Sequence, residues 1–187
     1  MWTLRREGVE RWCGAAAVVE VAVLEIITYP DPILLREAQT VPRVTRRVRR
    51  LARDMLETMY AASGIGLAAP QVGIQQRVIV VDVGDNPITL VNPEVTAAEG
   101  EQVGLESCLS LPDLVGEVRR AEWVAVSGLN RRGRPITVEG EGLLARALQH
   151  EVDHLNGILF IARIEDPTCL WRVSELKAAA QKEVVHV

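Results

Sequence analysis

A regular alternation of apolar and polar positions runs from residue 44 to residue 59. Its apolar residues recur mostly at spacings of three and four, which is the period of an α-helix with one buried face. The apolar residues are Val44, Val48, Leu51, Met55, Leu56 and Met59, and the polar positions carry Arg46, Arg47, Arg49, Arg50 and Arg53. We predict an amphipathic N-terminal helix. A basic face of this kind is usually only solvated, and an RNA-facing surface is the alternative.

Several later segments have the apolar, β-branched character of strands. "RVIVVDV" at 77–83 is followed, after a turn, by "PITLVNPEV" at 87–95. "RAEWVAVSGLN" at 120–130 and "PITVEG" at 135–140 flank "RRGR", which is a hairpin signal. Because strands follow one another and helices come afterwards, the pattern predicts an α+β domain with largely antiparallel β-sheets.

Two further helices are expected towards the C-terminus. Residues 142–155 place most of their apolar side chains on one side, and Asn156-Gly157 supplies a stop signal. Pro167 suits the first turn of a last helix. The side chains expected to face inward are Leu143, Leu144, Ala147, Leu148, Glu151 and His154, and then Leu170, Val173, Leu176 and Ala180. We expect the sheets to pack around the central helix at 142–155, with the amphipathic helix before it and a C-terminal helix after it.

The composition is that of one folded domain in a reducing compartment. The chain has 187 residues, of which 48% are hydrophobic and 25% charged, and this is ordinary for a globular protein. Its three cysteines are odd in number and far apart, so they predict no disulfide framework and favour the cytoplasm. The net charge of −4 gives no reason to expect the protein as a whole to bind nucleic acid, DNA included. No stretch approaches the roughly 20 apolar residues of a membrane span.

The first two dozen residues are a separate segment. They begin with arginines and continue with small apolar residues, but glutamates interrupt the apolar run, which argues against an export signal. We expect an N-terminal extension over 1–23 that is disordered or loosely attached. A single catalytic domain is then expected over 24–187.

The segment "ARALQHEVDHLNG" at 145–157 places His150 and His154 four positions apart, with Glu151 beside the first. On a helix these imidazoles lie one turn apart on one face and can bind the same metal ion. Glu151 is then placed to deprotonate a water that the metal has made acidic. The alternatives are a chance match and a set of hydrogen-bonded structural residues. Burial of two imidazoles and a carboxylate on a mainly apolar face is costly, which favours the metal site.

An open catalytic metal site needs a third protein ligand, and helix geometry does not choose it. Glu175, Cys169 and Cys108 are the candidates. With Glu175 the protein would be a zinc peptidase. With Cys108 and Cys169 together it would hold a closed, structural zinc ion.

Three segments in this order resemble the peptide deformylase family: "GIGLAAPQ" at 64–71, "ESCLS" at 106–110 and "QHEVDH" at 149–154. The resemblance extends from about residue 24 to about residue 180. It implies that Cys108, His150 and His154 bind one divalent metal ion. Iron(II) is usual in the family, and zinc, nickel or cobalt often takes its place.

The resemblance also implies the reaction and the roles in it. A water on the metal attacks the formyl carbon of an N-formylmethionyl nascent peptide, and Glu151 takes the proton from that water and delivers one to the departing amine. The side-chain amide of Gln71 and the backbone N–H of Leu109 stabilise the oxyanion, as charge developing on the formyl oxygen requires. Asp153 lies on another face of the helix and is expected to be an orienting or surface group.

Substrate is expected to lie along the other two motifs. Gly64 and Gly66, with Ile65 between them, permit close backbone approach, so that an extended peptide can add alongside as a strand. Glu106 and Ser107 complete the predicted substrate-binding residues. Glu106 is also expected either to pair with Arg119 or Arg120 or to be a solvated carboxylate.

Ser107 departs from the family pattern, which usually has glycine there. If the position required a positive φ, serine would be strained by about 1 kcal/mol. A degenerate member that binds formylated peptides with little turnover is therefore an alternative. A transient ribosome contact through the last helix is a further hypothesis, although Arg172, Lys177 and Lys182 do not align on one face.

Overall fold

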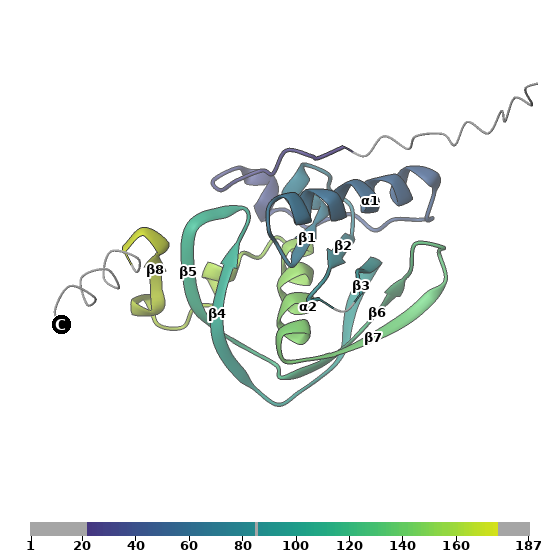
Figure 1. Ribbon diagram of the computed structural model, residues 1–187. Coiled ribbons are helices and arrows are strands. Elements are labelled where there is room, and N and C mark those ends of the chain that lie inside the picture. The colour runs from purple at the N-terminus through teal and green to yellow at the C-terminus, as the bar shows by residue number, and fades with distance from the viewer. Residues whose placement is uncertain (1–21, 85, 176–187) are drawn as a thin grey trace, which may run out of the picture.

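The computed structural model describes residues 22–84 and 86–175 (Figure 1). Nearly all of the predicted extension at 1–23 and most of the predicted last helix lie outside these residues, and both stay predictions. No helix within the described ranges is long and apolar enough to cross a membrane.

The predicted amphipathic helix is α1, Arg46–Ala61. Thr45 caps its N-terminus and accepts a hydrogen bond from the backbone N–H of Val48 at 3.4 Å. The apolar face is buried as predicted, with only Leu51 partly exposed. Short 3-10 turns lie elsewhere in the chain, at Pro32–Leu35 (η1), Ala69–Val72 (η2) and Phe160–Arg163 (η3).

A five-stranded antiparallel sheet has the strand order β1-β2-β3-β6-β7. It contains all four predicted strands, including the hairpin. The strands are β1 Gly66–Ala68, β2 Val78–Val81, β3 Ile88–Glu99, β6 Trp123–Leu129 and β7 Pro135–Glu141.

Side chains of β2 alternate between the two faces of this sheet, as the period of a strand requires. Val78 and Val80 pack with the apolar face of α1. Ile79 and Val81 pack with the second helix, α2, Gly142–Leu155. The sheet is thus buried between two helices, which explains why β2 is apolar at every position.

A second, three-stranded sheet has the order β4-β5-β8. Its strands are β4 Gln102–Cys108, β5 Leu111–Arg120 and β8 Leu170–Arg172. The prediction that the last helix starts at Pro167 is wrong. Pro167–Cys169 forms a 3-10 turn (η4) capped by the Asp166 side chain, and the next residues pair with β5 because its edge offers backbone partners. Helical backbone begins only at Val173.

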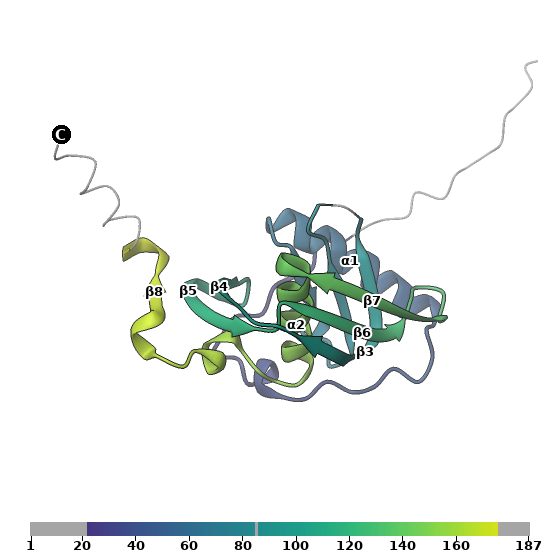
Figure 2. The same ribbon diagram turned by 90° about the horizontal axis from the view of Figure 1, so that it is seen from below.

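The helix α2 lies between the two sheets in both views (Figures 1 and 2). It ends where predicted, with Asn156 as C-cap and Gly157 in the left-handed region at φ 71°. Leu143 differs from the prediction, because its first-turn side chain is 54% exposed at the rim of a groove. The position of α2 gives it one face towards the core of the large sheet and another towards β4.

Candidate metal centre

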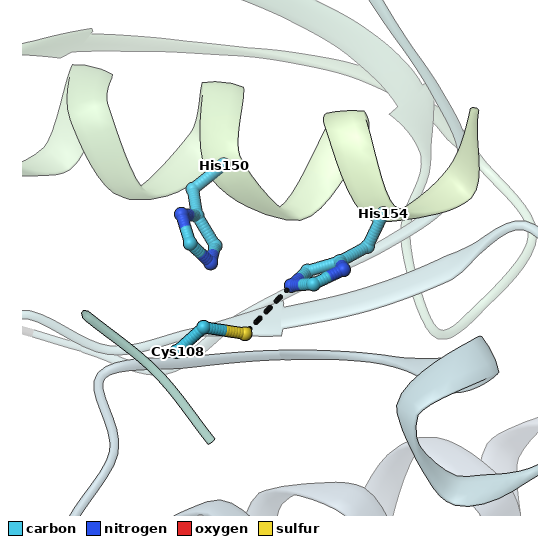
Figure 3. Close-up of side chains that lie close together, drawn as sticks. All are labelled: Cys108, His150 and His154. Carbon is cyan, nitrogen blue, oxygen red and sulfur yellow. Dashed lines mark hydrogen bonds between the residues drawn. The ribbon is translucent and has the colours of Figure 1, made fainter. Parts of the chain in front are cut away.

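Three potential metal ligands meet between β4 and α2. Cys108 ends β4, and His150 and His154 lie one turn apart on α2 (Figure 3). One ligand atom of each lies within 4.8 Å of the others. Cys108 Sγ is 3.2 Å from His154 Nε2. These residues are the ones that the sequence motifs singled out, and the fold brings them together across more than forty residues of chain.

The geometry of the three atoms fits one metal ion. Two ligand atoms that each bind a tetrahedral ion at 2.0–2.3 Å are about 3.5 Å apart. A thiolate and two imidazoles suit zinc or iron(II), and three ligands leave one position for water or substrate. Among the described residues, neither Glu175 nor Cys169 joins this group, and Glu175 is exposed.

The β4–β5 hairpin sets the direction of Cys108. A two-residue turn, Leu109–Ser110, joins the strands, and the pairing register shifts between Ser107 and Cys108. Such an irregularity re-aims a side chain relative to the regular pleat. Leu109, whose backbone N–H is predicted to donate to the oxyanion, follows Cys108 directly and lies in this turn.

A buried carboxylate holds His150. Glu106 Oε2 is 2.8 Å from His150 Nδ1, and the carboxylate also accepts hydrogen bonds from Arg120 Nε at 2.9 Å and Arg146 Nη1 at 2.8 Å. Burial alone would raise the pKa of Glu106, but the bonds from His150 and Arg120 and the charge of Arg120 lower it to about 2. An ionised Glu106 accepts a hydrogen bond from Nδ1–H, and in the neutral imidazole this tautomer leaves His150 Nε2 without a proton and able to bind a metal ion.

Arg120 and Arg146 continue this network into the protein. Arg120 also donates to Asp153, which is buried and bound by Arg163 as well. The expected pairing of Glu106 is thus with Arg120, because Arg119 pairs with Glu101 and Glu165.

Arg146 was missed by the sequence reasoning. The available signal was its position one helical turn before His150, on the face that carries the ligands. Arg146 also donates to the carbonyl oxygen of Val118 on β5, and so ties α2 to the smaller sheet.

Glu151 lines the same site, and one of its carboxylate oxygens has no hydrogen-bonding partner among the described residues. Its side chain is buried, and its Oε2 has no partner among the described residues. Burial, helped by the nearby charge of Glu106, raises the pKa of Glu151 to about 7 although His150 and Arg120 act to lower it. A Cβ atom added to Gly66 would overlap Glu151 Oε1 and lie 2.8 Å from its Cδ. Glycine at 66 is therefore what lets β1 approach this carboxylate.

Gln71 lies beside Cys108 and is 2% exposed. Its Nε2 is 3.5 Å from Cys108 Sγ and 3.2 Å from Ser110 Oγ. Its Oε1 accepts the backbone N–H of Ala68 at 2.8 Å, which fixes the amide orientation with the N–H groups towards the site.

The site opens into a groove of about 520 Å³. All five predicted substrate-binding residues line it, together with Cys108, His150 and Glu151. Ser107 is exposed in this groove. It is not among the described non-glycine residues with positive φ, so the strain that a positive φ would cause at this serine is absent. A larger hollow of about 820 Å³ contains neither Cys108 nor either histidine.

The α+β fold, with a cysteine and an HExxH helix around one pocket, defines a class of metal-binding hydrolases. Within this class, the sequence model of the polypeptide deformylase family matches residues 23–169. The chain belongs to the polypeptide deformylase family, and it is an enzyme of that kind.

Individual peptide deformylases are similar to this chain in sequence and in structure. A peptide deformylase of Pelotomaculum thermopropionicum is 49% identical over 146 residues, which are 78% of this chain and 94% of that protein. The crystal structure of peptide deformylase from Thermotoga maritima has a TM-score of 0.75 and 41% identity, and covers 77% of this chain and 99% of its own. A Met-Ala-Ser-bound peptide deformylase from Acinetobacter baumannii has a TM-score of 0.75 and 38% identity, with 78% and 100% covered.

Proposed function

We propose that this enzyme removes the formyl group from the N-terminal formylmethionine of nascent polypeptides by metal-assisted amide hydrolysis. The observation that carries the proposal is the buried Glu151 carboxylate, whose Oε2 has no partner among the described residues and lies beside the potential ligands. A buried carboxylate oxygen without a partner is costly, and a role as catalytic base would explain why it is kept.

We assign Cys108 Sγ and the Nε2 atoms of His150 and His154 as the metal ligands. Iron(II) is the proposed metal in the cell, with zinc, nickel and cobalt as alternatives, because this donor set suits all of them. When bound, a divalent ion supplies a Lewis acid and makes a water in the open position acidic. Glu106 keeps His150 in the tautomer that can bind.

Glu151 moves the proton. Its carboxylate takes a proton from the attacking water and holds it until the C–N bond breaks. It then delivers that proton to the amine of the departing methionine. Its burial excludes bulk water, so the proton stays at Oε1 or Oε2 between the two steps.

Gln71 and Leu109 stabilise the developing negative charge on the formyl oxygen. The Gln71 amide is fixed by Ala68, so its Nε2 is already oriented before substrate arrives. The Leu109 N–H is the second donor. Fixed neutral donors of this kind contribute to the rate because they need no reorganisation during the reaction.

The peptide is proposed to lie along residues 64–66 as an added strand. Ile65, Leu105 and Leu143 line the groove and are each more than 40% exposed. Apolar side chains at the rim of a groove mark a binding surface, and here they suit the side chain of methionine.

The test is formate release from formyl-Met-Ala-Ser by protein loaded anaerobically with iron(II). We expect turnover by the parent protein, a loss of about 10²–10⁴-fold in Glu151→Gln with metal retained, and loss of both metal and turnover in Cys108→Ala. Bound metal without formate release would favour the degenerate binder. Internal cleavage of unformylated peptides would favour the peptidase.

A further inference from the structure

The fold assembles a surface of arginines that the proposed reaction does not use. In both views the turn between β6 and β7 lies beside the N-terminal end of α1 (Figures 1 and 2). A Cβ added to Gly133 in that turn would be 3.5 Å from Val44, just before the helix. The "arginine surface" consists of Arg43, Arg46, Arg47, Arg49, Arg50, Arg53, Arg131, Arg132 and Arg134.

Most of these arginines have no acidic partner within the described ranges. All except Arg53 are exposed. Arg50 and Arg53 pair with Asp54. The other seven form no ion pair with a residue in 22–84 or 86–175: Arg43, Arg46, Arg47, Arg49, Arg131, Arg132 and Arg134.

Four exposed arginines lie elsewhere within the described residues, and three of them form ion pairs. Arg119 pairs with Glu101, Arg163 with Asp153, and Arg172 with Asp113, whereas Arg36 forms no ion pair with a described residue. The arginine surface holds nine of the chain's 21 basic residues, although acidic residues number 25 overall. Positive charge is therefore concentrated at one end of an otherwise acidic protein.

The position of the charge on α1 is also unfavourable for the helix itself. The first turn contains Arg46, Arg47 and Arg49 and no acidic residue. Cations at this end oppose the helix dipole and lower stability slightly. The helix gains no stability from arginines at its N-terminus, so their presence there indicates a functional reason.

The chemistry of the surface selects one class of partner. We propose that the arginine surface binds the phosphate backbone of RNA. One guanidinium group can donate two parallel hydrogen bonds to two oxygens of a phosphate, and arginine is preferred where nucleic acid is recognised. None of the exposed large apolar residues lies at 43–53 or 131–134, whereas a membrane-surface helix requires an exposed apolar face. The apolar face of α1 is already buried in the core.

The test is binding of a fluorescein-labelled RNA hairpin, followed by anisotropy between 50 and 200 mM KCl. The variant Arg46→Gln with Arg132→Gln removes one charge from each part of the surface. The control Arg36→Gln with Arg119→Gln makes the same net change at exposed arginines outside it. Both variants should release formate like the parent, because none of the four side chains touches the groove.

We expect the surface variant to bind RNA about tenfold more weakly than the parent. The slope of log K against log[KCl] should fall in magnitude by about 1.5–2, the value for two lost phosphate contacts. The control should bind like the parent. Equal weakening in both variants, or tighter binding to phosphatidylserine vesicles or poly-glutamate than to the hairpin, would overturn the proposal.

Discussion

Two groups of arginines in this protein differ in burial and in pairing. Behind the proposed metal centre, Arg120 and Arg146 are buried and bound to carboxylates and carbonyl oxygens. On the arginine surface, most side chains are exposed and form no ion pair with the described residues. A buried charge without a partner is very costly, so the first region must be fully paired. The second region is solvated, so it can leave its charge available to another molecule. The difference separates residues that build the site from residues that face outward.

The sharpest contrast is in stability. We expect Arg146→Ala to lower the free energy of unfolding by about 3 kcal/mol, because it leaves part of the buried Glu106 charge without a partner. Arg47→Ala should change it by less than about 1 kcal/mol, in the stabilising direction, because a cation leaves the N-terminus of α1. Urea unfolding at a fixed metal concentration measures both. Similar losses in the two variants would remove the distinction between the regions.

A glycine pair tests how tightly the site is built. A methyl side chain at Gly66 cannot fit without moving Glu151. A Cβ at Gly64 would have its one tight contact with the end of the Leu109 side chain, at 2.9 Å, and ordinary contacts at 3.5 Å. We expect Gly66→Ala to lower kcat/KM about 100-fold through misplacement of Glu151, the proposed base. Gly64→Ala should lower it only a few-fold. Formate release with metal content held equal gives the answer, and a harmless Gly66→Ala would contradict the placement of Glu151.

The same chemical change can be made in a buried and an exposed ion pair. Glu106→Gln removes the charge that orients His150, and we expect metal affinity to fall about 10–100-fold. Glu101 pairs with Arg119 at the surface, and Glu101→Gln should leave metal affinity unchanged. Competition against a chelator measures both affinities. Equal effects would mean that Glu106 does not act on the metal centre.

The smallest effect is expected at an exposed pair. Tyr60 donates a hydrogen bond to Asp82 at 2.6 Å, and this bond, with slight burial and the charge of Asp82, raises the pKa of Tyr60 to about 12. Stability from this bond is present below the usual tyrosine pKa of about 10 and is lost as pH rises through about 12. Asp82→Asn should bring the pKa of Tyr60 back towards about 10.

A Tyr29→Phe background leaves Tyr60 as the one tyrosine of the chain, since the sequence has two. Absorbance of tyrosinate at about pH 10.5 should then be low with Asp82 and high with asparagine. Equal absorbance in the two proteins would show that the pair does not form in solution.

Periodic, apolar segments were predictable from the sequence, and β4 shows why others were not. Both long helices and the strands β2, β3, β6 and β7 follow the usual rule of apolar residues inside. In β4 the rule is inverted, because Val103 and Leu105 are exposed while Glu106 is buried. Glu106 can be buried only because Arg120 and Arg146 reach it from other elements. No local pattern contains that information.

The part of the candidate site that lies in sequence motifs was predictable. The two histidines and Glu151 share one helix, so their proximity follows from helical spacing. Cys108 was assigned by resemblance, because its distance from α2 depends on the β4–β5 hairpin. The role of Arg146 and the two arginines that bind Asp153 were not predicted, since they depend on how β4, β5 and η3 lie against α2.

In the proposed site, one thiolate and two imidazoles hold a single metal ion. X-ray absorption at the zinc edge of zinc-loaded protein identifies these ligand atoms. We expect one sulfur at about 2.3 Å with nitrogen or oxygen atoms at about 2.0–2.1 Å, loss of the sulfur in Cys108→Ser and no change in Cys169→Ser. Two sulfur atoms in the parent protein, or a sulfur that persists in Cys108→Ser, would contradict the proposed site.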